Sequence, residues 1–166
     1  MTLFYSTFET PIGPFLVAVN ENKAVVATAF GKLPALKKRL RECHLLSDIQ
    51  KTSEIRRQVN QYFIRKRRTF ELDLAPSGTV FQHAVWDALS QIPMGQIRSY
   101  GQIAESIERP RAARAVGRAN ATNPICLIVP CHRVIGANGT LTGFAFGESL
   151  KRRLLLHEDA LPASFV

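Results

Sequence analysis

A cysteine–histidine pair directly after a short apolar run is the feature that most constrains this chain. The apolar run covers residues 125–129, and the string Pro130-Cys131-His132-Arg133-Val134 follows it. A turn signal, Ala137-Asn138-Gly139, comes shortly afterwards. An apolar run of this length between turn residues predicts a buried strand. The sequence therefore places Cys131 where a buried strand ends.

This pair permits two interpretations. A thiol beside a base or a cation forms more thiolate, which is the nucleophilic form of cysteine. Asn123, just upstream, fits such an activated site. The alternative is a buried structural cysteine next to an exposed histidine, because cysteine is among the most buried residue types. Features elsewhere in the chain must decide between the two.

The charge of the chain favours a polyanionic partner. Its 166 residues include 22 Lys and Arg but only 13 Asp and Glu, a formal net charge of +9. Such an excess favours nucleic acid first. The alternative is a generally solvated basic surface, and three basic runs are assigned to that surface here. They are Lys37-Lys38-Arg39, Arg65-Lys66-Arg67-Arg68 and Lys151-Arg152-Arg153.

The cysteine count predicts neither a disulfide framework nor a metal site. Cys43, Cys126 and Cys131 are odd in number and form no C-x-x-C motif, and the four histidines are scattered. We therefore expect no metal and no cofactor. The chain has no apolar run of membrane-spanning length, and its first residues lack a signal-peptide pattern. We expect an intracellular, cytoplasmic protein.

The order of predicted elements indicates an α+β fold with two lobes, residues 1–76 and 77–166. The first lobe is expected to be a small sheet with helices, and the second to be mainly helical. Strands are predicted at residues 3–5, 15–19, 24–28 and 70–74, and helices at 34–43, 53–63, 79–91, 99–108, 111–120 and 148–158. Thr79-x-x-Gln82 and Ser99-x-x-Gln102 have the form of capping boxes at two helix starts.

The helices predicted at 99–108 and 111–120 have the proportions of a helix-turn-helix. Arg111, Arg114 and Arg118 lie on or near one face of the second helix, which is otherwise rich in small residues. Arginines suit phosphate contacts, and small residues let a helix approach a groove wall closely. Long polar side chains that could read bases are scarce, so we expect DNA binding with little sequence preference. The alternative is an ordinary αα corner that packs a core.

Several separated motifs together resemble the O6-alkylguanine-DNA alkyltransferases, also called methylated-DNA–protein-cysteine methyltransferases. The resemblance is dense from Phe81 to Glu158, whereas the first 75 residues resemble the family only in length and in their β-then-α pattern. The motifs are Ser99-Tyr100, Ala112-Ala113-Arg114-Ala115-Val116-Gly117, Asn123-Pro124, Pro130-Cys131-His132-Arg133-Val134, Gly143-Phe144 and Leu154-Leu155-Leu156-His157-Glu158.

The resemblance implies a role for individual residues. It makes Cys131 the alkyl acceptor, with a side chain that we expect to be partly accessible. His132 and Glu158 would form a relay in which a water links imidazole and thiol, and Asn123 would brace the active-site turn. Tyr100 would donate to guanine N3, and Arg114 would replace the extruded base in the stack. The remaining candidates are Val134, Phe144, Ala145 and Phe146 for the substrate, and Ser99, Ala112, Ala113, Ala115, Gly117 and Arg118 for DNA.

The implied activity is repair of DNA by direct damage reversal. The alkyl group of O6-alkylguanine would move irreversibly to Cys131, once per protein molecule, after the base has been flipped out of the duplex. O4-alkylthymine is a second candidate substrate. We expect a monomer on double-stranded DNA, and whether copies bind cooperatively is left open. The alternatives are a non-catalytic lesion-binding helix-turn-helix protein and a cysteine hydrolase that uses Cys131, His132 and Asn123.

One segment departs from the family pattern. After Gly143 the family usually has an aromatic residue, often tyrosine, and then small residues that include glycines. This chain instead reads Phe144-Ala145-Phe146-Gly147. The resemblance implies that Phe146 narrows the pocket and favours small alkyl groups. The alternative is that Phe146 packs into the core against Leu150 and Leu154.

Overall fold

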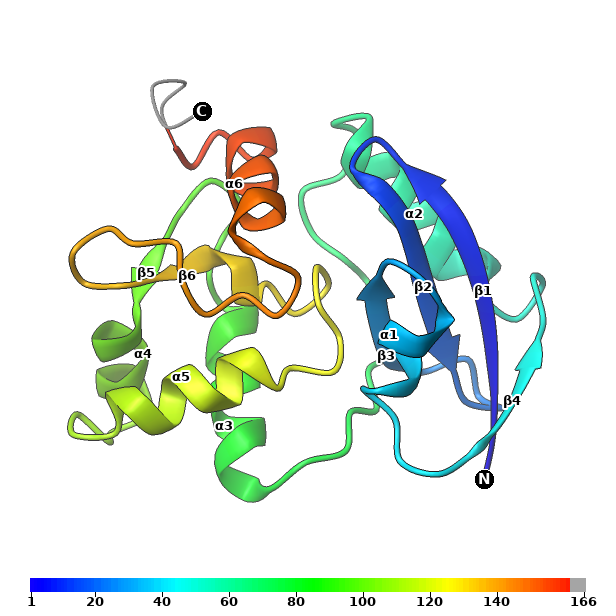
Figure 1. Cartoon of the computed structure of the whole chain (residues 1–166), viewed down its shortest axis with the longest axis horizontal. Helices are drawn as coiled ribbons and strands as arrows, with labels where there is room; N and C mark the ends of the chain where they lie inside the picture. Colours follow the sequence, from blue (N-terminus) through cyan, green and yellow to red (C-terminus); the bar gives the residue numbers. More distant parts are fainter. Residues whose placement is uncertain (162–166) are drawn as a thin grey trace. The chain divides into compact units, whose positions relative to one another are not determined.

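The computed structural model describes residues 1–161 and confirms the predicted α+β class (Figure 1). The chain divides into two compact units, Met1–Ser77 and Gly78–Val166. The first unit holds most of the strands, and the second holds four of the helices. No helix in the described part is long and apolar enough to cross a membrane.

The N-terminal unit is built on a four-stranded sheet with the order β3-β2-β1-β4. Its strands are β1 (Thr2–Thr10), β2 (Gly13–Val19), β3 (Val25–Phe30) and β4 (His44–Ser47). The pairs β1–β2 and β2–β3 are antiparallel, and β1–β4 is parallel. The rings of Phe8, Phe15 and Phe30 pack on one another beside the central strands. This aromatic cluster anchors the core of the unit.

Two helices complete this unit, α1 (Leu33–Lys37) and α2 (Ser53–Phe63). The predicted bounds of α2 are confirmed, and Ile55, Val59 and Tyr62 bury one of its faces. The helix predicted at 34–43 is wrong beyond Lys37, because the chain continues into β4. There it pairs with β1, and His44 N donates to the carbonyl of Met1, just before that strand.

The strand predicted at 70–74 is also wrong. The Gln58 side chain donates to Glu71 O and accepts from Glu71 N, so both backbone groups of Glu71 are satisfied locally. Only Leu74 forms a bridge, to Val25 at the edge of the sheet. Alternating hydrophobicity cannot reveal that a side chain takes over the backbone hydrogen bonds of a segment.

The C-terminal unit contains α3 (Val80–Ser90), α4 (Tyr100–Ser106), α5 (Ala113–Ala121) and α6 (Glu148–His157). Two short parallel strands, β5 (Arg98–Ser99) and β6 (Val134–Ile135), pair beside the 3₁₀ helix η1 (Cys131–Arg133). Both predicted capping boxes are present, at the starts of α3 and α4. The helices α4 and α5 pack against each other, as the predicted helix-turn-helix requires (Figure 1).

The buried strand predicted at 125–129 is wrong, although the segment is buried. It forms turns, with a bond from Val129 N to Ile125 O and a φ of 73° at Leu127. The Asn123 side chain donates to Val129 O (2.9 Å) and accepts from Ile125 N (3.0 Å). A short apolar run shows burial, but its periodicity cannot distinguish a strand from a braced turn.

Two helices of this unit end in the same way. After α4, Glu108 has a φ of 61°, and Arg109 N donates to Ala104 O. After α6, Asp159 has a φ of 57°, and Ala160 N donates to Leu155 O. A residue with left-handed φ after the helix, followed by a residue whose N–H donates to a carbonyl five positions earlier, forms a Schellman motif. It ends α4 earlier than predicted, and it leaves Glu158 as the C-cap of α6.

Candidate active site

The site is assembled around η1, which packs against α3 and α6. Cys131 N donates to Val129 O (2.8 Å), and Asn120 Nδ2 donates to Cys131 O (3.3 Å). Asn123 braces the turn just before it, which agrees with the contact that the resemblance implied. The backbone of Cys131 is therefore fixed from both sides. Asn120 was not singled out from the sequence, and an asparagine on the buried face of a helix was the signal that could have found it.

His132, Arg133 and Glu158 form a buried ionic cluster. His132 Nε2 lies 2.8 Å from Glu158 Oε2, while Arg133 Nε donates to Glu158 Oε1 (2.7 Å) and Arg133 Nη2 donates to Oε2 (3.0 Å). Arg133 also donates to Ile92 O (2.6 Å). Burial raises the pKa of Glu158, but the charges and hydrogen bonds of His132 and Arg133 outweigh this and hold it well below its usual range. Glu158 is therefore a carboxylate at neutral pH.

One ring nitrogen of His132 is not engaged by this cluster. His132 Nδ1 is buried, and it has no hydrogen-bond partner among residues 1–161. With Nε2 held by Glu158, Nδ1 is the nitrogen that a relay to the thiol would use. The contact of Arg133 with Glu158 was not predicted from the sequence, although Arg133 belongs to the recognised motif.

Tyr100, the first residue of α4, contacts the loop before α6. Its hydroxyl donates to Thr142 O (3.0 Å). Burial raises the pKa of Tyr100, and a thiolate at Cys131 would act in the same direction, so the phenol stays protonated and able to donate. Gly143 has a φ of 85°, and a Cβ there would lie 2.5 Å from the Tyr100 hydroxyl. This close approach requires glycine at position 143.

Lys151 is fully buried in α6, so its assignment to the solvated surface is wrong. Its Nζ donates to Val134 O (2.5 Å) and to Thr142 O (3.2 Å). Burial lowers the pKa of Lys151 to about 8, while Glu148 and a thiolate at Cys131 act in the opposite direction. Lys151 lies three and four residues before the buried Leu154 and Leu155, so helical spacing does place it on their face. The basic run obscures this signal, because charged residues are usually exposed.

The expected substrate-binding residues fall on two segments. Val134 is buried in β6, and residues 144–146 lie in the loop that leads into α6. Phe144 is buried, Phe146 is half-buried and Ala145 is exposed. The two phenylalanine rings meet edge to face, with centroids 5.6 Å apart. Phe146 therefore packs against Phe144. That Phe146 narrows the pocket for the alkyl group stays a prediction.

The expected DNA-binding residues lie on α4 and α5. Ser99 is the N-cap of α4, and Ala112 is the N-cap of α5. Arg114 and Arg118 are exposed on α5, while Val116 and Ala119 face the core. The small residues Ala113, Ala115 and Gly117 are half-buried. The helix thus presents its arginines to solvent, as the helical spacing predicted.

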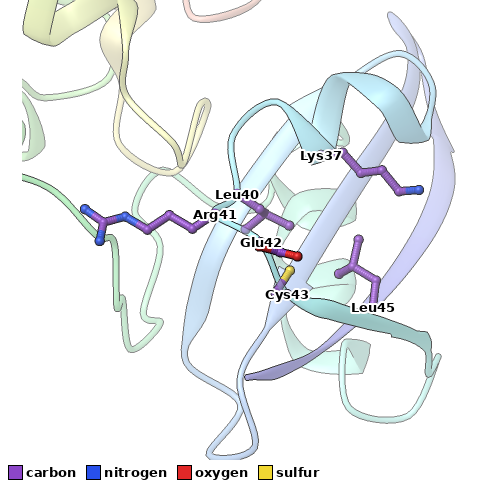
Figure 2. A pocket seen from close by; sticks show the side chains of 6 residues that line it. All are labelled: Lys37, Leu40, Arg41, Glu42, Cys43 and Leu45. Atoms are coloured by element: carbon purple, nitrogen blue, oxygen red, sulfur yellow. The ribbon is translucent and has the colours of Figure 1, made fainter.

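Exposure alone does not select the reactive cysteine. Cys131 is only 4% exposed, so the expected partial accessibility is wrong, because η1 is enclosed by α3 and α6. Cys126 is buried as well, and Cys43 is half-exposed. Figure 2 shows Cys43 among the residues that line a hollow of the N-terminal unit, together with Lys37 and Arg41. Only the surroundings of Cys131 mark it for chemistry.

Among residues 1–161, no three His, Cys, Asp or Glu side chains are grouped so that they could hold a metal ion.

Two family models match nearly the whole chain. The model of the 6-O-methylguanine DNA methyltransferase DNA-binding domain matches residues 80–160, and that of the ribonuclease-like domain matches residues 3–76. The chain belongs to this methyltransferase family. The resemblance seen in the motifs is thereby confirmed, and it extends to the N-terminal residues, where the sequence offered only a similar length and element order.

Individual family members are similar along their whole length. The methylated-DNA–protein-cysteine methyltransferase of Methanosarcina acetivorans is 45% identical over 159 residues, which are 95% of this chain and 99% of that protein. The Mycobacterium tuberculosis enzyme is 44% identical over 162 residues, with 97% and 96% covered. The crystal structure of M. tuberculosis O6-methylguanine methyltransferase matches with a TM-score of 0.84 at 41% identity, covering 97% of this chain and 96% of that one. M. tuberculosis OGT in complex with DNA matches with a TM-score of 0.85 at 41% identity, with 98% and 97% covered.

Proposed function

We propose that this protein repairs DNA by moving the alkyl group of O6-alkylguanine to Cys131, once per molecule. The observation that carries the proposal is the position of Cys131 beside the buried cluster of His132, Arg133 and Glu158. The names of the relatives and the neighbour solved with DNA support the reaction and the partner. We further propose that residues 77–166 bind DNA and accept the alkyl group, and that the protein acts inside the cell, with its DNA.

The transfer is a direct displacement at the alkyl carbon. The Cys131 thiolate attacks this carbon, the S–C bond forms and the bond from carbon to guanine O6 breaks. An alkyl carbon is a soft electrophile, for which a thiolate is the best side-chain nucleophile. The electron pair of the broken bond stays on guanine, which then takes up a proton. His132, oriented by Glu158, would accept the thiol proton through Nδ1, with a water as the link.

Tyr100 would stabilise the leaving base. Its hydroxyl is protonated and donates to Thr142 O in the structure described here. On substrate binding it would exchange this acceptor for guanine N3, where negative charge develops as the alkyl bond breaks. A donor aimed at charge that appears only in the transition state lowers the barrier selectively.

The reaction needs the base outside the duplex, because guanine O6 lies within the stack. Arg114, exposed on the first turns of α5, would take the place of the extruded base. The product is a thioether, which has no easy leaving path. The sequence-neighbouring thiol of Cys126 is buried at 1% exposure. The protein is therefore consumed by one turnover.

Mass spectrometry after incubation with DNA that contains O6-methylguanine tests the proposal. One methyl group per protein is expected, on the peptide that contains Cys131, and none in the Cys131→Ala variant. DNA binding by that variant should persist, because Arg114 and Arg118 are exposed on α5 and the substitution leaves the carbonyl of residue 131 that accepts from Asn120 in place. An unmodified wild-type protein that binds lesion DNA would favour the non-catalytic alternative, and a methyl group on Cys43 or Cys126 would refute the assignment of Cys131.

A further inference from the structure

The buried ammonium group of Lys151 is the most unusual charge in the C-terminal unit that the proposed mechanism leaves unused. A lysine side chain is almost never fully buried without a compensating partner, because its charge loses hydration. Lys151 is 0% exposed. It lies on the first half of α6, one turn after Glu148. Burial of this charge lowers the stability of the fold unless other contacts compensate, so the groups that the ammonium contacts are informative.

The hydrogen bonds of Lys151 join the two segments that flank the site. One acceptor is the carbonyl of Val134, three residues after Cys131, at 2.5 Å. The other is the carbonyl of Thr142, at 3.2 Å, which also accepts the Tyr100 hydroxyl. Gly143 follows directly, with no room for a Cβ beside that hydroxyl. The ammonium thus fixes the start of the loop that carries Phe144 and Phe146.

The charge of Lys151 is coupled to Cys131. A negative charge on Cys131 raises the pKa of Lys151, against the lowering effect of burial. Because electrostatic coupling acts in both directions, the ammonium in turn favours a negative charge on Cys131. The other charged or titratable groups near the thiol are His132 with its partners Glu158 and Arg133, and Tyr100. Glu148 is the remaining acidic group that acts on Lys151.

We propose that Lys151 is a positioning residue of the alkyl-transfer site. Its ammonium holds the Val134 and Thr142 carbonyls together and supplies a buried positive charge that stabilises the Cys131 thiolate. This inference rests on the proposed function for its consequence in repair. Its physical content is the bridge from Lys151 to the Val134 and Thr142 carbonyls and the charge coupling to Cys131, and both can be tested without DNA.

The first experiment measures thiol reactivity without DNA. The rate of Cys131 alkylation by iodoacetamide is followed against pH by peptide mass spectrometry, which separates Cys131 from Cys43 and Cys126. In Lys151→Met the pH midpoint should move up by about one unit, so labelling below the midpoint should slow about tenfold. The matched control is Arg153→Met, which removes one positive charge from the exposed side of the same helix. It should leave the midpoint where it is.

The second experiment reads the same coupling from the other side and does not alter Lys151. Lysine-selective NMR follows the titration of Lys151 in the wild-type protein and in Cys131→Ser, in which no thiolate can form. The pKa of Lys151 should fall in the variant by an amount comparable to the shift of the thiol midpoint. A purely structural lysine would titrate identically in both proteins.

An unchanged Lys151 titration in Cys131→Ser overturns the proposal, even if Lys151→Met fails to fold. So does an equal midpoint shift in Lys151→Met and Arg153→Met. The proposed function fails separately, if the wild-type protein takes no methyl group from lesion DNA while both coupling measurements give the expected shifts.

Discussion

Glu158 occupies a position that is unfavourable for a carboxylate by itself. It is the C-cap of α6, where the helix dipole disfavours negative charge, and it is only 2% exposed. His132 and Arg133 offset both effects by holding its two oxygens. Breaking a buried ion pair from one side is strongly destabilising, because the remaining charge loses its partner. The cluster therefore links the stability of the unit to the orientation of His132.

Glu158→Gln tests this link. At neutral pH the variant should lose about 3 kcal/mol of unfolding free energy, since Arg133 keeps its charge but faces a neutral amide. Because the pKa of Glu158 is lowered in the folded protein, its contribution is present above its unfolded value and disappears as pH falls through the folded value. Urea unfolding at several pH values should show the gap to wild type shrinking below about pH 4.5, the ordinary value of a glutamate.

Glu105→Gln, at an exposed position of α4, provides the control and should change stability by less than about 0.5 kcal/mol. A gap between wild type and Glu158→Gln that is equal at all pH values would contradict the assignment of the charge to Glu158.

Residues were predictable from the sequence where a motif names them, and hidden where burial gives them their role. Cys131, His132, Glu158 and Asn123 belong to recognised motifs, and the structure brings them together around η1. The sequence predicts Lys151 to be part of a basic surface run, but it is buried. Charged residues are so often exposed that composition alone cannot identify a buried one.

Among the elements, α5 carries the face that would meet DNA. Arg114 should do more than contact phosphate if it replaces the flipped base. Arg114→Ala should then slow repair of duplex DNA about tenfold or more, since extrusion of a base requires a few kcal/mol. Rates of methyl transfer are compared for a lesion in a normal pair, opposite a mismatch and in a single strand. The defect should shrink along that series.

Arg118→Ala is the matched control, because Arg118 is exposed on the same helix. It should weaken binding and slow repair by similar factors on every substrate. An Arg114→Ala defect as large with free O6-benzylguanine as with duplex DNA would refute the base-replacement role.

The loop before α6 should set the range of alkyl groups accepted. Phe144→Ala should slow methyl and benzyl transfer alike, because an aromatic contact with a base contributes roughly 1–3 kcal/mol. Phe146→Ala should instead raise the rate of benzyl transfer relative to methyl transfer, because it removes a ring beside Phe144. Single-turnover rates with the two adducts give this ratio. An unchanged ratio accompanied by a loss of stability would assign Phe146 to the core.

Elements with strong helical periodicity or a capping box were predictable, whereas segments held by tertiary contacts were not. The bounds of α2 and the two capping boxes follow from the sequence. The strand β4 has an exposed, unremarkable sequence and exists because β1 offers it an edge. The turn at 125–129 depends on the Asn123 side chain, which no hydrophobic pattern reports.

At the scale of the whole molecule, the positive charge is not concentrated where DNA binding is proposed. Residues 1–77 carry 13 Lys and Arg against 7 Asp and Glu, whereas residues 78–166 carry 9 against 6. Two thirds of the net charge of +9 therefore belongs to the N-terminal unit. Net charge raises the rate of encounter with DNA, but the salt dependence of affinity counts phosphate contacts. The two effects can be separated experimentally.

The comparison of Arg118→Gln with Lys66→Gln makes that separation, because each removes one exposed positive charge, the first from α5 and the second from the turn after α2. Affinity for duplex DNA is measured across a series of salt concentrations. Arg118→Gln should reduce the steepness of the log–log plot by about 0.9, the value for one phosphate contact on duplex DNA. Lys66→Gln should reduce the slope by much less than 0.9, because it weakens only the long-range field, and it should slow association at low salt. Equal losses of slope in the two variants would show that the N-terminal unit contacts phosphate directly, and the DNA-binding surface would then extend beyond residues 77–166.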